Sequence, residues 1–441
     1  MIVNSSCDNS YEGDYLTVKT CRGEDQFTFD LPEFSCFSDT VDLKKWIAGW
    51  GTGSPYYDAG VENLRRVVAA DAVNGTLTLG NLYRGKGFPA NGDRIVFWNL
   101  QPSGFIKSAH NPLIGTEWFH SFNGNSAGLA DVVYDSTVSK WVMLIVETDA
   151  STSNTFLASS ANLVDWQPAA QGLPVFTSGL FSGIDWAGYD RNGRSAQAAI
   201  PTEVIYHQGK WFIFVYAYNE KGAGSVGVVT TECLTKGPYY VGKVPLLTPG
   251  TKDSWDARAC QNAKVTPYKG RFVMFYAGED NKGTENVGTA VSGDLLHWNK
   301  YKGNPVIKDH YGWRSALSNS EPSYVSVSGD SIYLMVAGKK EFREGFWHRH
   351  IAGQQYTGVS GNVDDTQIGV YMSRDEGRSF IAHINNPVFC NDYSDPFENE
   401  HLGPGISIVE TDTADYLFYF AKSSFKGMKY NIHLRVRSLK K

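Results

Sequence analysis

A strand–hairpin–strand unit that recurs five times between residues 128 and 421 constrains the fold of this chain more than any other feature. Each copy has an apolar strand with polar residues near its start, a tight hairpin and an aromatic strand. The copies begin near positions 130, 201, 262, 321 and 405. Spacings of roughly 60 to 80 residues, each carrying one four-stranded unit, predict an all-β, five-bladed β-propeller.

The outer half of the unit also repeats, in residues 156–166, 288–298 and 369–380. Each of these segments has a serine at a strand end, a short polar turn and then Trp or Phe. We expect the short polar side chains to bond the turn backbone while the aromatic ring packs between blades. Residues 93–114 precede the first copy and a lone strand at 431–436 ends the chain, so we expect both ends to close the fifth blade.

The first part of the chain has a different character. Residues 37–46, followed by an Asn-Gly turn and a strand at 74–79, resemble the opening of jelly-roll sugar-binding modules, although only the opening is present. We therefore divide the chain into a small N-terminal β-rich accessory region, residues 1–95, and a propeller domain, residues 96–441.

Composition agrees with this division and limits the partners. The chain has 441 residues, 45 of them glycine, and 14% aromatic residues, which suits a large, turn-rich all-β protein. Its net charge of -6, without a basic run, argues against nucleic acid or an anionic membrane as a partner. The N-terminus lacks the basic and apolar regions of a signal peptide, which predicts a cytoplasmic form, a mature secreted fragment or a virion-associated protein. The oligomeric state stays open.

Cysteine and histidine spacings do not indicate a metal site. The six cysteines lack zinc spacing, and we interpret them as reduced thiols. The pair His348 and His350 has no third ligand nearby in the sequence, which is typical of a polar loop.

Several carboxylates stand near the starts of the predicted first strands. In a propeller these strand ends converge on the axial funnel, where function is usually found. Paired carboxylates are what glycoside hydrolysis needs, because one protonates the leaving oxygen while the other activates water or attacks the sugar. An acid before a strand can also cap its own turn, and for each single residue that alternative stays open. The candidates are Asp131, Glu203, Asp256, Glu321 and the Glu400–His401 pair.

Short motifs around these acids resemble those of the five-bladed β-propeller glycosidases, over residues 105 to 441. Asn-Pro-Leu-Ile at 111–114, Ala-Asp at 130–131, Pro-Thr-Glu at 201–203 and Ser-Glu-Pro at 320–322 carry the resemblance. Glycoside hydrolase family 43 is the nearest in pattern, and the group includes arabinanases, β-xylosidases and invertase-like enzymes. The resemblance implies a poly- or oligosaccharide substrate and hydrolysis by acid/base chemistry with inversion. It assigns the general base to Asp131, the general acid to Glu321 and a substrate contact to Glu203.

The third blade departs from the family pattern. Where the family has an Asp that tunes the acid, residues 260–264 read Cys-Gln-Asn-Ala-Lys. Either Asp256 supplies that carboxylate from the preceding loop, or the carboxylate is missing. We expect Asp256 beside Glu321, with Arg258 donating to substrate hydroxyls or to a carboxylate. The resemblance further implies that no cofactor is required, allows a structural calcium ion at the axis, and gives His401 a place near it.

Three tryptophans, Trp186, Trp255 and Trp313, stand in loops beside the predicted first strands. An indole face stacks on the C–H face of a sugar, so we expect these residues to line the funnel rim, the alternative being a wedge between blades. The departure in the third blade also keeps a second function open. A non-catalytic carbohydrate-binding propeller, such as an adhesin or a phage-type receptor-binding protein, would need the sugar site without the third acid.

Overall fold

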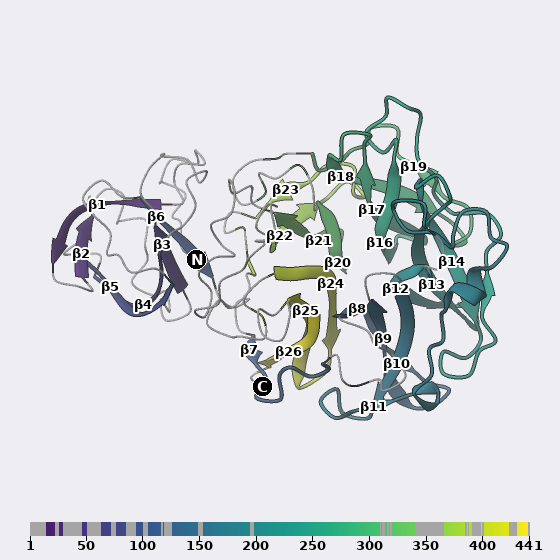
Figure 1. Cartoon of the computed structure of the whole chain (residues 1–441), viewed down its shortest axis with the longest axis horizontal. Helices are drawn as coiled ribbons and strands as arrows, with labels where there is room; N and C mark the ends of the chain where they lie inside the picture. The colour runs from purple at the N-terminus through teal and green to yellow at the C-terminus, as the bar shows by residue number, and fades with distance from the viewer. Residues whose placement is uncertain are drawn as a thin grey trace.

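The computed structural model is built almost entirely of β-strands (Figure 1). It describes residues 105–115, 126–148, 153–194, 198–308, 320–339, 366–383, 401–422 and 430–439, single positions between them, and the backbone of strands between residues 15 and 99. The helices in this part of the chain are two short 3₁₀ turns, η4 (Ala170–Gly172) and η5 (Ser178–Phe181). None of its helical segments has the length and hydrophobicity of a transmembrane span.

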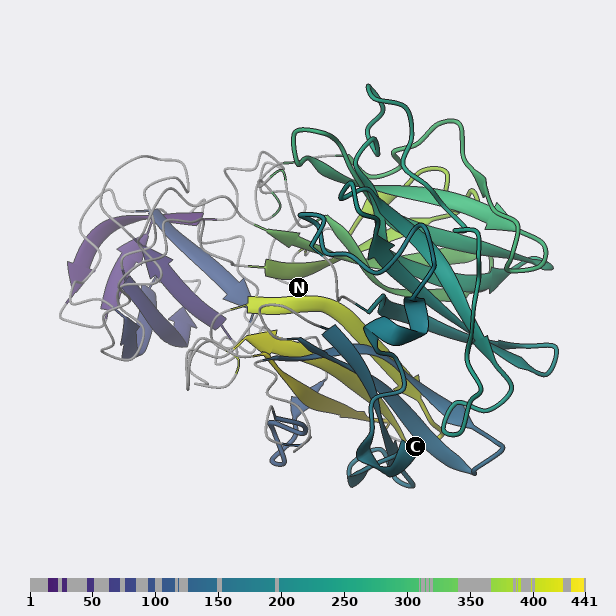
Figure 2. The same cartoon turned by 45° about the vertical axis from the view of Figure 1, so that its right-hand side comes forward.

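Five blades of four antiparallel strands form a ring around a common axis, and the first strand of each lies at the centre (Figures 1 and 2). A single parallel bridge between Gly224 and Ala259 joins the second and third blades into one continuous sheet. The predicted five-bladed β-propeller is confirmed. Blade 1 contains β8 (Ser126–Asp135), β9 (Lys140–Thr148), β10 (Ser153–Ser160) and β11 (Trp166–Pro168). Blade 2 contains β12 (Ile200–His207), β13 (Lys210–Tyr218), β14 (Gly224–Thr231) and β15 (Tyr240–Val241).

The other three blades follow the same order. Blade 3 contains β16 (Ala259–Tyr268), β17 (Arg271–Glu279), β18 (Glu285–Ser292) and β19 (Asn299–Lys300). Blade 4 contains β20 (Glu321–Ser328), β21 (Ser331–Lys339), β22 (Thr366–Ser373) and β23 (Ile381–Ala382). Blade 5 contains β24 (His401–Glu410), β25 (Ala414–Lys422), β26 (Tyr430–Ser438) and β7 (Ile106–Lys107). The entry end is our name for the end of the ring at which the first strands begin.

The fifth blade is closed by both ends of the propeller chain, as the sequence predicts. Strand β7 pairs antiparallel with β26, Lys107 opposite Arg435. Asn111 then exchanges two hydrogen bonds with the backbone of Leu434, through its side-chain amide and its carbonyl oxygen. Pairing β7 with the last strand completes the fourth row of blade 5, which satisfies backbone groups that an open edge would expose.

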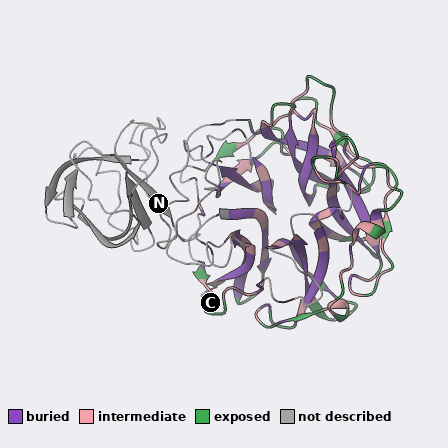
Figure 3. Cartoon of the chain, in the orientation of Figure 1, coloured by how far each residue is buried: buried purple, intermediate pink, exposed green. Residues whose placement is uncertain are grey.

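The apolar core lies in the interfaces between blades and not within single sheets. The described part of the chain contains five clusters of buried apolar side chains, one for each pair of neighbouring blades. Figure 3 shows the buried residues concentrated along the inner strands. Because a blade buries both of its faces, its second strand is a continuous apolar run, as in β17.

The outer hairpins explain how neighbouring blades lock together. In blade 1 the Ser160 hydroxyl oxygen accepts hydrogen bonds from the backbone N–H groups of Asn162 and Leu163, and Leu163 takes φ 67°. The turn presents Trp166, which is 4% exposed and packs edge-on against Phe418 of blade 5 at 5.7 Å. The same hairpin in blades 3 and 4 places Trp298 against Phe214 and Phe380 against Phe275, each on the preceding blade. The predicted hairpin and its packing are confirmed.

The N-terminal region forms a six-stranded closed barrel. Its last strand pairs with the first and the third and runs to residue 99, so the barrel extends slightly beyond the expected boundary at residue 95. The strands are β1 (Tyr15–Arg22), β2 (Gln26–Phe29), β3 (Trp46–Trp50), β4 (Asn63–Asp71), β5 (Thr76–Arg84) and β6 (Arg94–Asn99).

Replacing Trp166 by alanine is expected to destabilise the propeller by about 3–5 kcal/mol, because it empties an indole-sized volume between blades 1 and 5. Thermal unfolding measures the effect as a lower Tm. The matched control is Gln167→Ala, an exposed neighbour on the same strand, which should leave Tm nearly unchanged. Equal Tm values for the two variants would contradict the wedge role of the outer-hairpin aromatic residues.

Candidate active site

Every first strand carries an irregularity in the pairing register near its start. An extra residue in one strand bends that strand and changes the direction of side chains that would otherwise point into the interfaces between blades. In blades 1, 2, 4 and 5 these shifts fall at or beside the acids that the sequence singles out, and in blade 3 the shift includes Asn262. They lie between Leu129 and Asp131, Pro201 and Glu203, Gln261 and Lys264, Pro322 and Tyr324, and Leu402 and Ile406.

Glu321 is the first residue of β20 and lies at the entry end. One oxygen of its carboxylate accepts a hydrogen bond from the Asn262 side-chain amide. Burial is the main cause that raises the pKa of Glu321 to about 8, and the negative charge of Glu285 adds to it, while the Asn262 hydrogen bond lowers it. A carboxylic acid of this pKa carries a proton near neutral pH, which is the state that a general acid requires.

Glu285 is the neighbouring carboxylate, and the sequence analysis missed it. It begins β18, the third strand of blade 3, opposite Glu279 in the ladder. Its two oxygens accept hydrogen bonds from the Gln261 side-chain amide at 3.1 Å and from the Ser320 backbone N–H at 3.2 Å. Because Ser320 directly precedes Glu321, this contact fixes the two carboxylates near each other. The sequence signal for Glu285 is that acids stand on both sides of the β17–β18 turn, Glu279 before it and Glu285 after it.

Asn262 stands on β16 where the resemblance places an acid. It adopts φ 47°, in the left-handed region that asparagine tolerates better than most residues. Its amide is a donor to Glu321 and carries no charge, so the third carboxylate of the family pattern is absent from this position.

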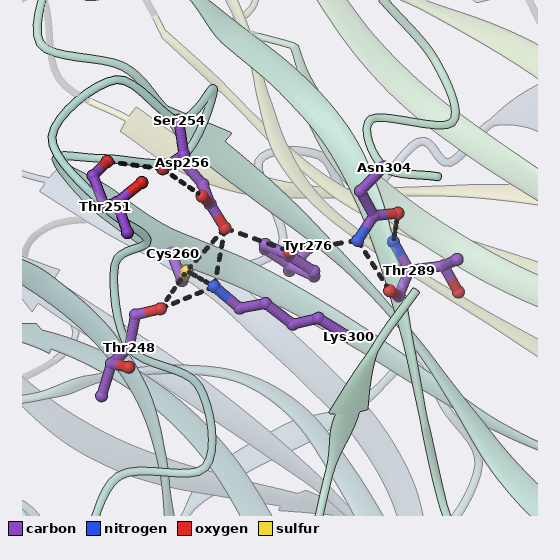
Figure 4. Close-up of polar contacts among 9 residues, drawn as sticks. All are labelled: Thr248, Thr251, Ser254, Asp256, Cys260, Tyr276, Thr289, Lys300 and Asn304. Atoms are coloured by element: carbon purple, nitrogen blue, oxygen red, sulfur yellow. Dashed lines mark hydrogen bonds and ion pairs between the residues drawn. The ribbon is translucent and has the colours of Figure 1, made fainter. Parts of the chain in front are cut away.

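Asp256 does not lie beside Glu321, and that expectation is corrected. Figure 4 shows its carboxylate in a polar cluster of blade 3. It pairs with the Lys300 ammonium at 2.6 Å and accepts hydrogen bonds from Ser254 at 2.9 Å and Tyr276 at 3.2 Å. Lys300 belongs to β19, the outermost strand of blade 3. Its ammonium lies against the loop before β16 and neutralises the buried carboxylate of Asp256. Asp256 therefore stabilises the loop before blade 3.

Arg258 lies at the entry end and donates to a carboxylate, that of Glu279, which is one of its two expected roles. Its Nη1 lies 3.3 Å from Glu279 Oε1, and Arg191 pairs with the same oxygen. Glu279 ends β17 and is fully buried. Burial raises the pKa of Glu279, while the charges of Arg191 and then Arg258 lower it. The substrate contact proposed for Arg258 stays a prediction.

The tryptophans are placed differently from the expectation. Trp186 is 5% exposed, donates to the Gly242 carbonyl at 3.0 Å and lies against Gly227, where a Cβ would meet the indole ring at 2.1 Å. It fills a slot in the interface between blades 1 and 2, so the rim assignment is wrong for it. Trp255 likewise covers Gly278 and is half-buried against blade 3. Trp313 lies outside the described residues.

Two tyrosines supply aromatic surface near Glu321 instead. Tyr216 and Tyr218 lie on one face at the end of β13, with ring centroids 6.2 Å apart and planes at 86°. Burial raises the pKa of both phenols, and the charge of Glu321 contributes to each shift. The signal for these tyrosines in the sequence is their period-two spacing at a strand end, whereas the rim prediction rests on tryptophans.

Asp131 and Glu203 lie further along their strands than Glu321. Asp131 Oδ1 accepts from Ser407 Oγ of blade 5 and from the Val132 N–H, and its Oδ2 accepts from the Val204 N–H of blade 2. Burial raises the pKa of Asp131, against the Lys264 charge and these hydrogen bonds, which lower it. Burial also raises the pKa of Glu203 to about 8, with the Lys264 charge opposing and that of Asp131 adding.

A buried ammonium lies among oxygen atoms of the inner strands of blades 1 and 2. Lys264 is 3% exposed and donates to the Thr202 carbonyl at 2.6 Å and to the Ala130 carbonyl at 3.4 Å, and it pairs with Glu203 at 3.3 Å. These oxygens of blades 1 and 2 already bind the Lys264 ammonium, so they do not provide an additional site for a calcium ion. Among the described residues no group of three or more His, Cys, Asp or Glu side chains could hold a metal ion. His401 begins β24, opposite Lys422, and its side chain lies outside the described residues.

Comparison with solved structures identifies the class of fold. A glycosyl hydrolase from Bacteroides ovatus superposes with a TM-score of 0.54 at 16% identity, covering 77% of this chain and 97% of that one. A structure from the GH130 family, described as mannoside phosphorylases that include glycoside hydrolases acting on β-1,2 mannosidic linkages in Candida mannan, has a TM-score of 0.53 at 16% identity, covering 76% and 94%. A thermostable family-43 glycoside hydrolase has a TM-score of 0.50 at 15% identity, covering 72% and 95%.

These structures are five-bladed β-propeller enzymes, and this chain has their fold. No protein-family model and no curated protein matches its sequence. At such low identities the likeness establishes the architecture, and the chemistry has to be argued from the side chains.

Lys264→Met is expected to destabilise the protein by about 3–5 kcal/mol, because it leaves the Glu203 carboxylate and two carbonyl oxygens without their buried cation. Lys269→Met is the control, since Lys269 forms an exposed ion pair with Asp330 and should change Tm little. If Lys264 replaces a structural calcium ion, EDTA leaves the Tm of the wild-type protein unchanged. A lower wild-type Tm in EDTA would contradict that replacement.

Proposed function

We propose that this protein is a glycoside hydrolase that cleaves a poly- or oligosaccharide at the entry end of the propeller. The observation that carries the proposal is Glu321, whose pKa is raised to about 8 by burial and by the adjacent Glu285 charge. Such a carboxyl group can give its proton to a glycosidic oxygen at neutral pH. Tyr216 and Tyr218 offer ring surface for a sugar beside it.

In this proposal Glu321 is the general acid and Asp131 the general base. Asp131 sits at the register shift of β8 in blade 1, and Glu321 begins β20 in blade 4. Blades 1 and 4 are separated by blade 5 on one side and by blades 2 and 3 on the other, so the two carboxyl groups come from blades that are not neighbours. We propose inversion, for which the carboxyl groups lie roughly 6.5 to 9.5 Å apart with a water molecule between them.

The proton then moves in one concerted step. Glu321 protonates the leaving oxygen as the glycosidic bond breaks, and Asp131 removes a proton from the water that attacks the anomeric carbon from the opposite face. Lys264 donates to the carbonyls of Ala130 and Thr202 and pairs with Glu203. We propose that Glu203 shapes the sugar site without transferring a proton.

A carbohydrate-binding propeller without catalysis is the second candidate function, and Asn262 favours it. A neutral amide stabilises the ionised form of Glu321, which opposes the role of an acid, whereas an aspartate at this position would raise its pKa. A screen against arabinans, xylans, fructans and bacterial capsular polysaccharides, scored for retention and for new reducing ends, separates the two functions. Retention without cleavage across the panel would contradict hydrolysis.

Glu321→Gln is expected to lower turnover by about 10²- to 10⁴-fold, because the amide cannot protonate the leaving oxygen. Activated aryl glycosides should lose less, since their leaving groups need little protonation. The matched control is Glu410→Gln, an exposed carboxylate at the far end of the inner strand β24. Steady-state kinetics on the natural glycan measure the effect, and an unchanged rate would remove Glu321 from the mechanism.

Glu285→Gln is expected to shift the alkaline limb of the pH–rate profile to lower pH. Removing the negative charge makes ionisation of Glu321 easier, so its pKa falls and the protonated acid is lost earlier as the pH rises. Profiles of kcat/KM against pH measure the shift, and infrared titration of the buried carboxyl groups measures the same pKa without substrate. An alkaline limb at the wild-type position would mean that Glu285 does not tune the acid.

A further inference from the structure

Two arginines from different loops meet at one buried carboxylate of the entry end. Arg191 comes from the loop before blade 2 and Arg258 from the loop before blade 3, and both pair with Oε1 of Glu279. The Glu279 side chain is fully buried. Its second oxygen, Oε2, has no hydrogen-bond partner among the described residues. The group of Arg191, Arg258 and Glu279 has a formal charge of +1.

Most donors of this arginine pair remain available. Each guanidinium has five N–H donors, and in the described part of the chain Glu279 is the only side chain that either of them binds. The side chains of Arg191 and Arg258 are 47% and 32% exposed. A salt bridge that served the fold alone would need only one arginine, and would not need either head group to face solvent.

The backbone holds Arg191 in place. The bridge between Tyr189 and Tyr218 ties its loop to the end of β13. The next hairpin packs so tightly on this loop that a Cβ on Gly222 would come within 2.7 Å of the Arg191 carbonyl oxygen. Because its backbone is fixed and its guanidinium is already paired with Glu279, Arg191 loses less conformational entropy when it binds an anion.

The pair borders the proposed catalytic acid. The charge of Arg191 lowers the pKa of Glu321, and it also acts on the phenols of Tyr216 and Tyr218. The arginine, the two rings and the acid therefore surround the same region of the entry end. A sugar ring against the tyrosines would bring its substituents to the guanidinium groups.

We infer that Arg191 and Arg258 form a subsite for the carboxylate of an acidic sugar, and that the glycan bound next to Glu321 contains uronic acid residues. The inference rests on the proposed function and names its substrate class. A planar guanidinium binds a carboxylate through two parallel hydrogen bonds, which gives a uronate both charge and geometry to recognise. The net charge of -6 does not prevent this, because charges beyond about 8 Å are screened at physiological salt whereas the pair is in contact with its ligand.

The test measures binding of uronate oligosaccharides by isothermal titration calorimetry. Oligomers of galacturonate, glucuronate and mannuronate are each compared with the same oligomer after its carboxyl groups are reduced to alcohols. At least one acidic oligomer should bind the wild-type protein ten times or more tightly than its reduced counterpart. Arg191→Gln and Arg258→Gln should each lower that affinity by about 10- to 100-fold, and added salt should weaken binding in the wild type most.

Single variants keep the other arginine on Glu279, so the buried carboxylate stays paired and the fold is preserved. Arg194→Gln is the matched control, since Arg194 lies on the same loop but pairs with Asp190. Calorimetric Tm values verify folding. Equal affinity for acidic and reduced oligomers, no binding of any acidic oligomer, or unchanged affinity in both variants would overturn the inference. Saturable binding of inorganic phosphate that depends on Arg191, without binding of any uronate, would also overturn it.

The outcome is separate from that of the proposed hydrolase activity. If acidic glycans are bound through the arginine pair but not cut, the subsite stands and hydrolysis fails. If neutral glycans are cut and acidic ones are not bound, hydrolysis stands and the subsite fails.

Discussion

The closure of the fifth blade is the constraint on which the rest of the ring depends. Without β7, β26 would be an open edge, and blade 5 would lose its pairing with the chain segment that leads into blade 1. Beyond the ladder, charges reinforce the closure: Lys107 of β7 and Arg435 of β26 both pair with the buried Glu398. A ring locked at this point holds its five inner strands at fixed positions, so side chains from blades far apart in the sequence can meet at the axis.

Register shifts turn this rigid ring into a site. In a regular ladder alternate side chains would point into the two blade interfaces, where the core lies. The shift in β8, between Leu129 and Asp131, turns Asp131 toward donors on blades 2 and 5. The shift in β16, between Gln261 and Lys264, lets Asn262 reach Glu321 of the next blade. The energetic cost of the irregular pairing is met by hydrogen bonds across blades, such as that from Thr202 to the Ala263 carbonyl.

The sequence predicts the fold well because each blade repeats a local pattern, and turn chemistry such as that of Ser160 and Leu163 acts over a few residues. It predicts the inner-strand acids for the same reason. It does not predict Glu285, because that residue belongs to a third strand and approaches Glu321 only through the fold. The rim was misassigned because glycines on neighbouring strands open slots that bury indole rings, as Gly227 does for Trp186. The place of Asp256 was not predicted because its carboxylate pairs with Lys300, which is 44 residues further along the chain.

Residue 262 is an asparagine where the family pattern has an aspartate, and this difference changes which groups set the pKa of Glu321. An aspartate there would raise the pKa of Glu321 by direct repulsion, whereas the amide hydrogen bond lowers it. Glu285 supplies a negative charge instead, and the hydrogen bonds from Gln261 and from the Ser320 N–H hold its carboxylate in place. Burial is the largest cause of the raised pKa of Glu321, the charges of Glu285 and Glu279 add to it, and the charge of Arg191 lowers it. A ligand carboxylate bound to Arg191 would neutralise the arginine and raise the pKa of Glu321 at the moment when the acid is needed.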